Sequence, residues 1–389
     1  MSFRMPTVSI IAFMLSGCAV PPVAPLPEAQ IWHDVAFQYQ QQWVTETAAT
    51  LFDLDESVVR SFKTAHRQSY TTEKRLDQLL SQLYGQNGIR LSYASGHSTG
   101  AAQTWNDQRG DCLSLTILVY SAAKSLGLAP HMQEVRVPMA IDRHDGVDFI
   151  NDHVNVFIRT DDEISINGRS LRSGGVIIDF DPQAGSRQIG QWLSEDEILA
   201  RFFNNRATEF LVQRDDQRAY AYYRSAITTD PHFGPAFANL AQLYQRRGLL
   251  QQAEQLLRYA IALQGSSYAP LRSMRELLQA QGRAAEAEQY ANLLKKRQEE
   301  DPYHWLGVGL AAMQRGRFGS AVSALERAAA LTSGFEEIHR NLAMAYWRNG
   351  QREAASKQLK VLTALNSKDP GVALLSRKMR EPVPESEAH

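Results

Sequence analysis

The sequence predicts two folds in one chain of 389 residues: an α+β domain, followed by an all-α solenoid of helical repeats. Glycines and alanines recur every 34 residues through the C-terminal half, which is the period of a two-helix repeat. Ahead of them, an apolar helical segment beginning at Cys112 is followed by several strand-like segments. With 44% apolar and 21% charged residues, the composition is that of a folded protein and excludes a disordered chain.

The first 18 residues, MSFRMPTVSIIAFMLSGC, have the layout of a secretory signal: an early cation, a short apolar run and small residues before Cys18. The apolar run is shorter than the roughly 20 residues that a membrane-spanning helix needs. The segment LSGC at 15–18 resembles the lipobox of bacterial lipoproteins, which implies cleavage after residue 17 and lipidation of Cys18. The alternative is an ordinary signal peptide with a chance cysteine.

A proline-rich linker at 18–30 is expected to hold the body of the protein away from the lipid. Ala19 follows the lipidated position, and by resemblance to lipoprotein sorting rules it indicates the outer membrane rather than the inner one. We therefore expect a protein of the bacterial cell envelope, lipid-anchored and facing the periplasm. With Cys18 acylated, Cys112 is the only free thiol and no internal disulfide can form.

The α+β domain is expected at 31–199. Its first part is helical up to Gly85, and a buried central helix begins at Cys112 and ends at Gly127. The segments predicted as strands are 132–137, 153–158, 164–166 before an Asn167-Gly168 turn, and 176–180.

Cys112 is expected in the first turn of its helix, where free backbone N–H groups and the helix dipole favour a thiolate. The neighbouring Asp111 carboxylate opposes that charge, so a nearby base is needed. His153 shares its predicted strand face with Asn155, and Asp179 ends an apolar strand. A lone cysteine at a helix start is otherwise simply a small buried apolar residue.

Cysteine, histidine and acid in this order, in the segments GDCLSLT, NDHVNV and VIIDFDP, resemble the transglutaminase-like, papain-like cysteine hydrolases. The resemblance, strongest to transglutaminase-like bacterial lipoproteins with C-terminal repeats, implies a catalytic triad of Cys112, His153 and Asp179. Asp181 is the alternative acid. An oxyanion could be bound by the backbone N–H of Cys112 and by a side chain just upstream: Gln103, Trp105, Asn106 or Gln108.

The segment GHSTG at 96–100 also fits the nucleophile elbow of serine hydrolases. That fold needs strands before the elbow and a late histidine, whereas helices precede this segment and repeats follow the domain. The spacing of His131, His144 and His153 does not suit a metal, and there is no glycine-rich phosphate loop. We expect neither a metal nor another cofactor.

The repeats are expected at 200–380 as five units to about 369 and a capping helix, before a polar tail at 381–389. The glycines of the 34-residue ladder are Gly248, Gly282, Gly316 and Gly350, and its alanines are Ala219, Ala253, Ala287, Ala321 and Ala355. This pattern resembles the tetratricopeptide repeat, and Arg214 replaces the glycine of the first unit. The resemblance implies a concave groove whose lining would include Gln242, Arg246, Met344, Trp347 and Arg348.

Two functions remain open from the sequence. The first is an envelope cysteine hydrolase or acyltransferase acting on peptide amides, with the repeats recruiting a protein or peptide partner. The second is a non-catalytic scaffold anchored to the membrane by its lipid. Forty-one Lys and Arg against 42 Asp and Glu give a net charge of −1, so nucleic acid is not an expected partner.

Overall fold

The computed structural model of the chain describes residues 24–64, 71–84, 89, 91–94, 96–135, 142–144, 147–149, 153–166, 169–180, 189–263, 268–332, 336–365, 372, 375–377 and 379. The predicted signal peptide with Cys18, the alternative acid Asp181 and the polar tail lie outside these residues. In the described part, no helix is both long enough and apolar enough to span a bilayer.

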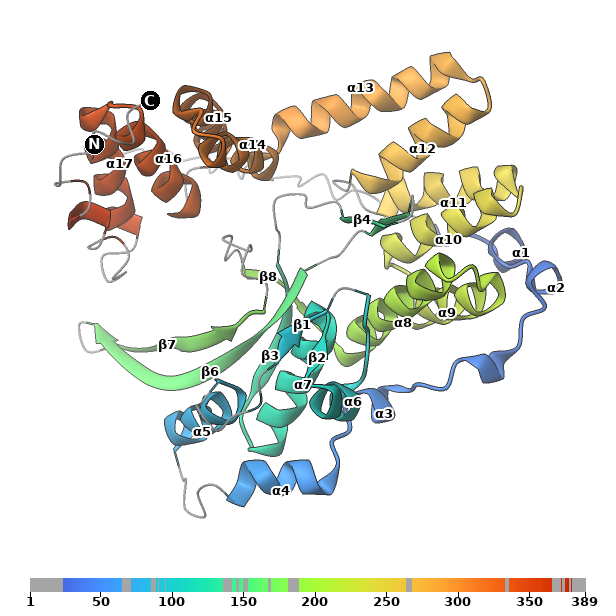
Figure 1. The fold of residues 1–389 in the computed structure, drawn as a ribbon, viewed down its shortest axis with the longest axis horizontal. Coiled ribbons are helices and arrows are strands. Elements are labelled where there is room, and N and C mark those ends of the chain that lie inside the picture. Colours follow the sequence, from blue (N-terminus) through green and yellow to red (C-terminus); the bar gives the residue numbers. More distant parts are fainter. Residues whose placement is uncertain are drawn as a thin grey trace, which may run out of the picture.

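The described part of the chain begins with an arm of short helices that packs on the repeats, and the last of these helices also contacts the α+β domain. Its elements are α1 (Glu28–Ile31), α2 (Asp34–Phe37), the 3₁₀ turn η1 (Gln41–Trp43) and α3 (Ala48–Phe52). Figure 1 shows α1 and α2 beside the first repeats, far from the sheet. The hydroxyl of Tyr220 donates to Asp34 at 2.7 Å, and that of Tyr244 donates to the carbonyl of Ile31 at 2.5 Å. Residues 28–37 therefore pack against the solenoid, although the residues from 31 onward were expected in the α+β domain.

The α+β domain has four main helices, and α7 is the buried one at its centre. They are α4 (Glu56–Thr64), α5 (Thr72–Tyr84), α6 (Ala101–Asp107) and α7 (Cys112–Ser125). The predicted helix from Cys112 is confirmed, and it ends because Gly127 adopts φ +70°, a conformation that costs glycine little. Eleven of the 14 residues of α7 are buried, which makes it the centre of the domain.

A four-stranded antiparallel sheet packs on α7 in the order β7-β6-β3-β8. Its strands are β3 (Pro130–Val135), β6 (His153–Ile166), β7 (Arg169–Ile178) and β8 (Ile189–Leu193). Two small two-stranded sheets pair β1 (Ser92–Tyr93) with β2 (Arg109–Gly110), and β4 (Asp142–His144) with β5 (Val147–Phe149). The predicted strands 153–158 and 164–166 form one strand, whose pairing with β7 is irregular between Thr160 and Glu163.

The two faces of the sheet differ in chemistry, as the alternation of residues in β6 predicts. Val154, Val156 and Ile158 are at most 1% exposed and share one apolar core with residues of α7. His153 and Asn155 alternate with them and therefore lie on the opposite face. The apolar face fixes the register of β6, and this register places the polar side chains together.

Ten helices of the described chain form five hairpins after residue 194. They are α8 (Glu195–Val212) with α9 (Asp216–Thr229), α10 (Gly234–Arg246) with α11 (Leu250–Leu263), α12 (Ala269–Ala280) with α13 (Ala284–Glu300), α14 (Pro302–Gln314) with α15 (Phe318–Leu331), and α16 (Glu336–Arg348) with α17 (Arg352–Leu365). The five alanines of the ladder are at most 2% exposed, because each lies where two helices meet. The four ladder glycines have φ of +70° to +79°, and Arg214 adopts φ +63° in their place in the first unit.

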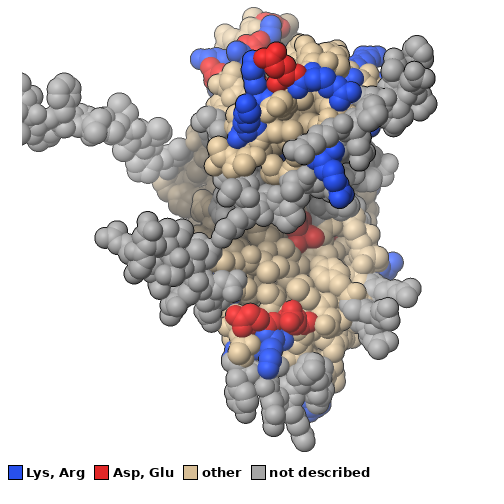
Figure 2. Space-filling view, turned by 90° about the vertical axis from the view of Figure 1, so that its left-hand side faces the viewer, with Lys and Arg blue, Asp and Glu red and all other residues tan. Residues whose placement is uncertain are grey.

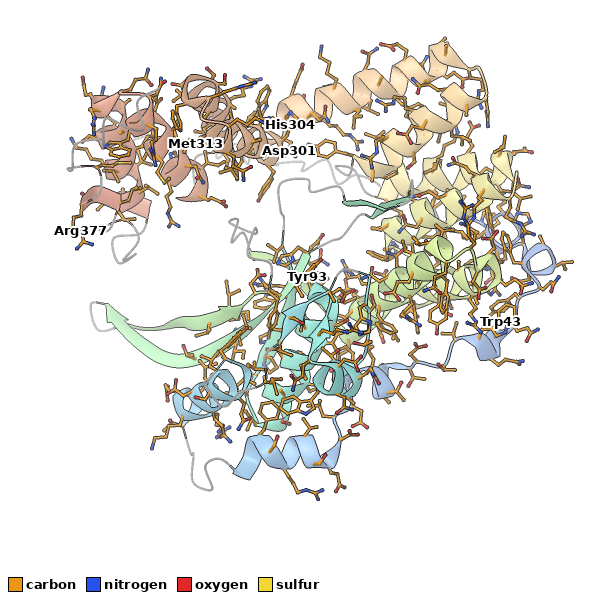
Figure 3. All side chains as sticks on the ribbon, in the orientation of Figure 1. Trp43, Tyr93, Asp301, His304, Met313 and Arg377 are labelled. Carbon is orange, nitrogen blue, oxygen red and sulfur yellow. The ribbon has the colours of Figure 1, made fainter. Side chains whose placement is uncertain are left out.

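The described repeats contribute to two large apolar cores and to a third, small cluster of Ala343, Leu362, Val372 and Leu375. The first runs from Ile31 to Ala287 and joins the arm, the α+β domain and the first repeats. The second begins at Leu306 and ends at Ala355. Helix α13 connects them and buries only Ala287 (Figure 1). Figure 3 shows Asp301 and His304 at this junction, where Asp301 caps α14 by accepting from the backbone N–H of Tyr303 at 2.8 Å.

Candidate active site and repeat surface

The structure brings His153 and Asp179 together at one end of the sheet. His153 Nε2 lies 2.6 Å from Asp179 Oδ1, and Asn155 Nδ2 donates to Asp179 Oδ2 at 3.0 Å. Val156 pairs with Ile178, so the residue opposite Asn155 in the adjacent strand is Asp179. Both oxygens of the carboxylate are therefore occupied by neighbours from β6, which fixes its orientation next to the imidazole.

Cys112 is the first residue of α7, as expected, and is 7% exposed. The hydroxyl of Thr116, one helical turn later on the same side of α7, donates to the backbone carbonyl of Val154 at 3.1 Å. Val154 directly follows His153 in β6. The start of α7 thus crosses the sheet near the start of β6.

Asp111 caps α7 and is only 6% exposed. Its Oδ1 accepts hydrogen bonds from the backbone N–H and the hydroxyl of Ser114, both at 2.7 Å. Its Oδ2 accepts from the hydroxyl of Ser98 at 2.5 Å and from Asn205 Nδ2 at 3.3 Å. Four donors surround the carboxylate, which disperses the charge that opposes a thiolate at Cys112.

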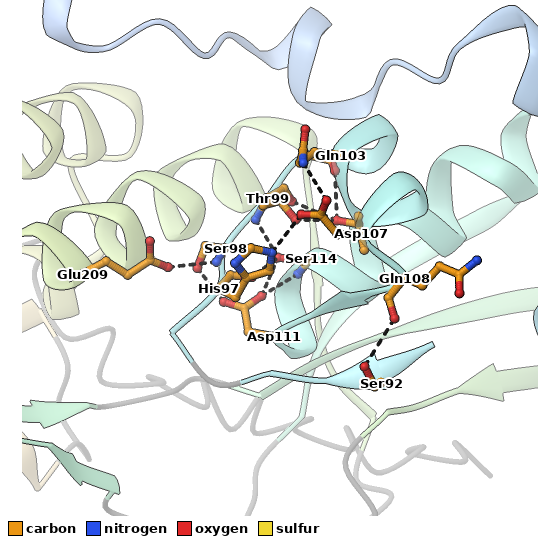
Figure 4. A network of polar contacts seen from close by, with 12 residues as sticks. Ser92, His97, Ser98, Thr99, Gln103, Asp107, Gln108, Asp111, Ser114 and Glu209 are labelled. Carbon is orange, nitrogen blue, oxygen red and sulfur yellow. Dashed lines mark hydrogen bonds and ion pairs between the residues drawn. The ribbon is translucent and has the colours of Figure 1, made fainter. Parts of the chain in front are cut away.

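The GHSTG segment is part of this buried network (Figure 4). Ser98 is 2% exposed, and its backbone N–H donates to Glu209 of α8 at 2.8 Å. His97 pairs with Asp107 at 3.0 Å. Ser98 therefore ties the start of α7 to the first repeat.

The upstream oxyanion candidates lie on or just after α6. Gln103 donates to Asp107 at 2.8 Å, so its amide already has a partner. Asn106 and Gln108 are exposed, and Figure 4 shows the side chain of Gln108 directed away from Asp111. Trp105 packs on Phe62 with the ring centroids 5.1 Å apart. Their role as oxyanion donors stays a prediction.

Reasoning from the sequence assigned no role to two residues near the site. Asn155 orients Asp179, and its position two residues after His153 was the available signal. The ring of Tyr84, at the end of α5, stacks on that of Phe180 at 6.2 Å. Tyr84 is 55% exposed, and partial desolvation together with the charge of Asp179 raises its pKa to about 12. No local pattern connects Tyr84 with a strand almost 100 positions later.

The candidate groove residues have different surroundings. Gln242 donates to Asn239 at 3.2 Å, and Arg246 forms an ion pair with Asp216 as well as a 2.6 Å hydrogen bond to the carbonyl of Leu211. Trp347 is 5% exposed, and the guanidinium carbons of Arg348 and Arg352 lie 5.5 and 5.2 Å from its ring centroid. Met344 and Arg348 are half-buried. Figure 2 shows charges of both signs side by side at the top of the molecule.

Metal binding gains no support from the residues that the structure describes. Among them, no three histidine, cysteine, aspartate or glutamate side chains gather closely enough to hold an ion.

Residues 312–379 match the family model of the tetratricopeptide repeat. Solved structures with similarity to the chain include PilF of Pseudomonas aeruginosa (18% identity, 48% of this chain, 85% of that chain, TM-score 0.26). PilW, a type IV pilus biogenesis factor, matches at 22% identity over 49% of this chain and 88% of that chain, with a TM-score of 0.25. YrrB, a repeat protein with an unusual peptide-binding site, matches at 18% identity over 46% of this chain and 92% of that chain, with a TM-score of 0.24.

TM-scores this low do not establish a common fold. No curated protein matches the chain. The family match and the 34-residue recurrence of hairpins from α8 to α17 together identify the C-terminal part of the chain as a tetratricopeptide-repeat array.

Proposed function

We propose that the chain is a lipid-anchored envelope protein whose α+β domain is a transglutaminase-like cysteine hydrolase or acyltransferase, with repeats that recruit a protein or peptide partner. The observation that carries the proposal is the 2.6 Å contact between His153 and Asp179, with Asn155 on the second carboxylate oxygen. A buried histidine held by a carboxylate is the arrangement that a general base needs.

The proposed chemistry is covalent. The thiolate of Cys112 attacks the carbonyl carbon of an amide, and the negative charge moves to the carbonyl oxygen. His153, protonated by the thiol, gives that proton to the leaving amine as the C–N bond breaks. Asp179 holds the imidazole and stabilises its cation. Water, deprotonated by His153, then releases the acid and restores the thiol, whereas an amine in place of water gives a new amide.

The position of Cys112 supports its role as the nucleophile. The backbone N–H groups and the dipole at the start of α7 favour a negative charge there. The adjacent carboxylate of Asp111 would work against this charge, but its four hydrogen bonds weaken that effect. The contact of Thr116 with Val154 supports a location of Cys112 near His153.

A non-catalytic scaffold is the second candidate, and the burial of Cys112 favours it. A thiol that is 7% exposed is also what a purely structural cysteine would show. The single apolar core shared by the domain and the first repeats suits a rigid adaptor as well. In this case the lipid anchor and the protein-binding repeats would be the whole function.

Alkylation by iodoacetamide separates the two candidates. The mature chain, residues 18–389, carrying Cys18→Ser has Cys112 as its only cysteine. If Cys112 and His153 form an ion pair, alkylation is fast at pH 6 and slows at least roughly tenfold in His153→Ala. The matched control is His131→Ala, because His131 lies on another strand and packs on Trp192 at 4.6 Å. Slow alkylation that His153→Ala does not change would support the scaffold instead.

A further inference from the structure

Helix α8 of the first repeat reaches into the network that begins the helix of Cys112. Asn205 Nδ2 donates to Oδ2 of Asp111 at 3.3 Å, and Glu209 Oε1 accepts from the backbone N–H of Ser98 at 2.8 Å. Ser98 closes the link through its 2.5 Å hydrogen bond to the same oxygen of Asp111 (Figure 4). Two side chains of one repeat helix therefore hold the residue that precedes Cys112.

Three of the four groups in these contacts are buried, and Asn205 is half-buried. Asp111, Ser98 and Glu209 are 6%, 2% and 8% exposed. A buried carboxylate is costly unless it is hydrogen-bonded, and losing one donor leaves that cost uncompensated. Arg206 on the same helix donates to the other oxygen of Glu209 at 2.5 Å. The repeat helix thus brings its own counter-charge to the junction.

The donors to Asp111 come from two parts of the chain. Ser114 and Ser98 belong to the α+β domain, whereas Asn205 is 94 residues away in the repeats. The Asp111 carboxylate lies next to Cys112 in the sequence, so anything that strengthens its effective charge opposes a thiolate there. The hydrogen bond from Asn205 weakens this opposition.

We propose that Asn205 and Glu209 are positioning residues for Cys112, and that the first repeat is therefore part of the candidate active site rather than only a binding module. The inference rests on the proposed function, because it takes Cys112 to be the nucleophile. Asn205 holds and partly neutralises the Asp111 cap, and Glu209 fixes the Ser98 loop that supports the cap. The two residues have opposite effects on the thiolate of Cys112. Asn205 favours the thiolate because it donates to the Asp111 carboxylate, whereas Glu209 opposes it because it adds a second negative charge.

Electrostatics agrees with this geometry. Burial raises the pKa of Glu209, Arg206 counteracts that rise, and the Asp111 carboxylate adds to it. Other ionisable groups lie on or beside the elements that pack against α7. They are the His97–Asp107 pair, Arg109, the His153–Asp179 pair and Tyr84.

The experiment is the pH dependence of Cys112 alkylation by iodoacetamide in the mature chain carrying Cys18→Ser. Asn205→Asp replaces a donor by a like charge and is expected to raise the pH midpoint by about one unit. Glu209→Gln keeps an acceptor for Ser98 but removes the charge, and is expected to lower the midpoint by a few tenths of a unit. The matched control is Asn204→Asp, since Asn204 Oδ1 accepts from Asn239 at 2.9 Å, a role that a carboxylate retains.

Opposite shifts for Asn205→Asp and Glu209→Gln, with an unchanged midpoint for Asn204→Asp, would support the inference. Unchanged midpoints in folded Asn205→Asp and Glu209→Gln would overturn it. A shift of the same size in Asn204→Asp would also overturn it, because a general effect of charge would then suffice. If Asn205→Asp does not fold, as judged by circular dichroism, the sign of the Glu209→Gln shift decides alone.

The outcome is separable from that of the proposed function. His153→Ala tests whether the imidazole activates the thiol, and the repeat variants test whether α8 controls the cap. Midpoint shifts in the repeat variants, without any effect of His153→Ala, would contradict the enzyme proposal. They would still support control of the Asp111 cap by α8.

Discussion

The ring of Phe37 lies parallel to the ring of Tyr220, with an angle of 3° between the planes and 4.4 Å between the centroids. Phe37 also stacks on Tyr244 of the second repeat at 5.5 Å. The arm is therefore held by both of the first two repeats. If Cys18 carries the proposed lipid, the tether reaches the body of the protein at the repeats and not at the α+β domain.

Phe37→Ala is expected to lower the free energy of unfolding by about 3–5 kcal/mol, because it leaves a cavity beside two tyrosine rings in a site that is 1% exposed. Urea denaturation followed by circular dichroism measures this change. Val35, two residues earlier in the same short helix, is 93% exposed, so Val35→Ala should change the stability by less than about 0.5 kcal/mol. Equal effects of the two substitutions would contradict the packing of the arm.

Periodic features of the fold could be predicted from the sequence, and contacts between distant segments could not. The ladder of glycines and alanines predicts all five hairpins, and the alternation in β6 predicts which side chains face away from the core. Two contacts could not be predicted: Phe37 stacks on Tyr220, and Asn205 donates a hydrogen bond to Asp111. Each joins single residues more than 90 positions apart, so neither produces a repeating pattern in the sequence. Asp179 and Asp181 have the same strand parity, so only the register with β6 singles out Asp179 as the partner of His153.

Asp179→Asn should slow alkylation of Cys112 by iodoacetamide at pH 6 at least roughly tenfold, because the imidazole loses the negative charge that stabilises its cation. The rate is measured in the mature chain carrying Cys18→Ser, by mass spectrometry of the labelled protein. Asp181→Asn serves as the control, since Asp181 is the alternative acid. A loss of rate in Asp181→Asn, with Asp179→Asn unaffected, would show that the acid is assigned to the wrong residue.

Arg214→Gly is expected to raise the free energy of unfolding by about 0.5–1 kcal/mol. Arg214 adopts φ +63°, a conformation that a side chain makes unfavourable and that the corresponding glycines adopt freely. Burial is the largest cause that lowers the pKa of Arg246, and the charges of Arg214 and Arg247 lower it further. Removing the Arg214 side chain therefore relieves a repulsion between like charges. In the reverse substitution, Gly248→Arg should destabilise the protein by about 1–2 kcal/mol, although no atom lies within 4 Å of the added Cβ. Urea denaturation of both variants tests the sign of each change.

The two large apolar cores predict two unfolding transitions. Leu325 is fully buried in the second core, and Leu325→Ala should destabilise that part by about 2–5 kcal/mol. Leu257 is equally buried in the first core, so Leu257→Ala should shift the other transition. Differential scanning calorimetry resolves the two events. A single transition that both substitutions shift by the same amount would mean that α13 transmits cooperativity between the cores.

The stability of the second core should fall as the pH rises from about 4.5 to about 7. Burial raises the pKa of Glu337, on α16, to about 7, although Arg340 opposes the change, and Glu337 Oε2 is buried without a hydrogen-bond partner. Between these two pH values the folded state binds more protons than the unfolded state, so folding is favoured at the acidic end and is penalised once the carboxyl must ionise. The melting temperature of the second transition is therefore expected to be higher at pH 5 than at pH 7.5, and Glu337→Gln should remove most of this difference by keeping the group neutral at both values. The exposed Glu353→Gln is the matched control on α17, because its carboxylate pairs with Lys357 at the surface. A pH dependence that survives in Glu337→Gln would assign the proton to another group.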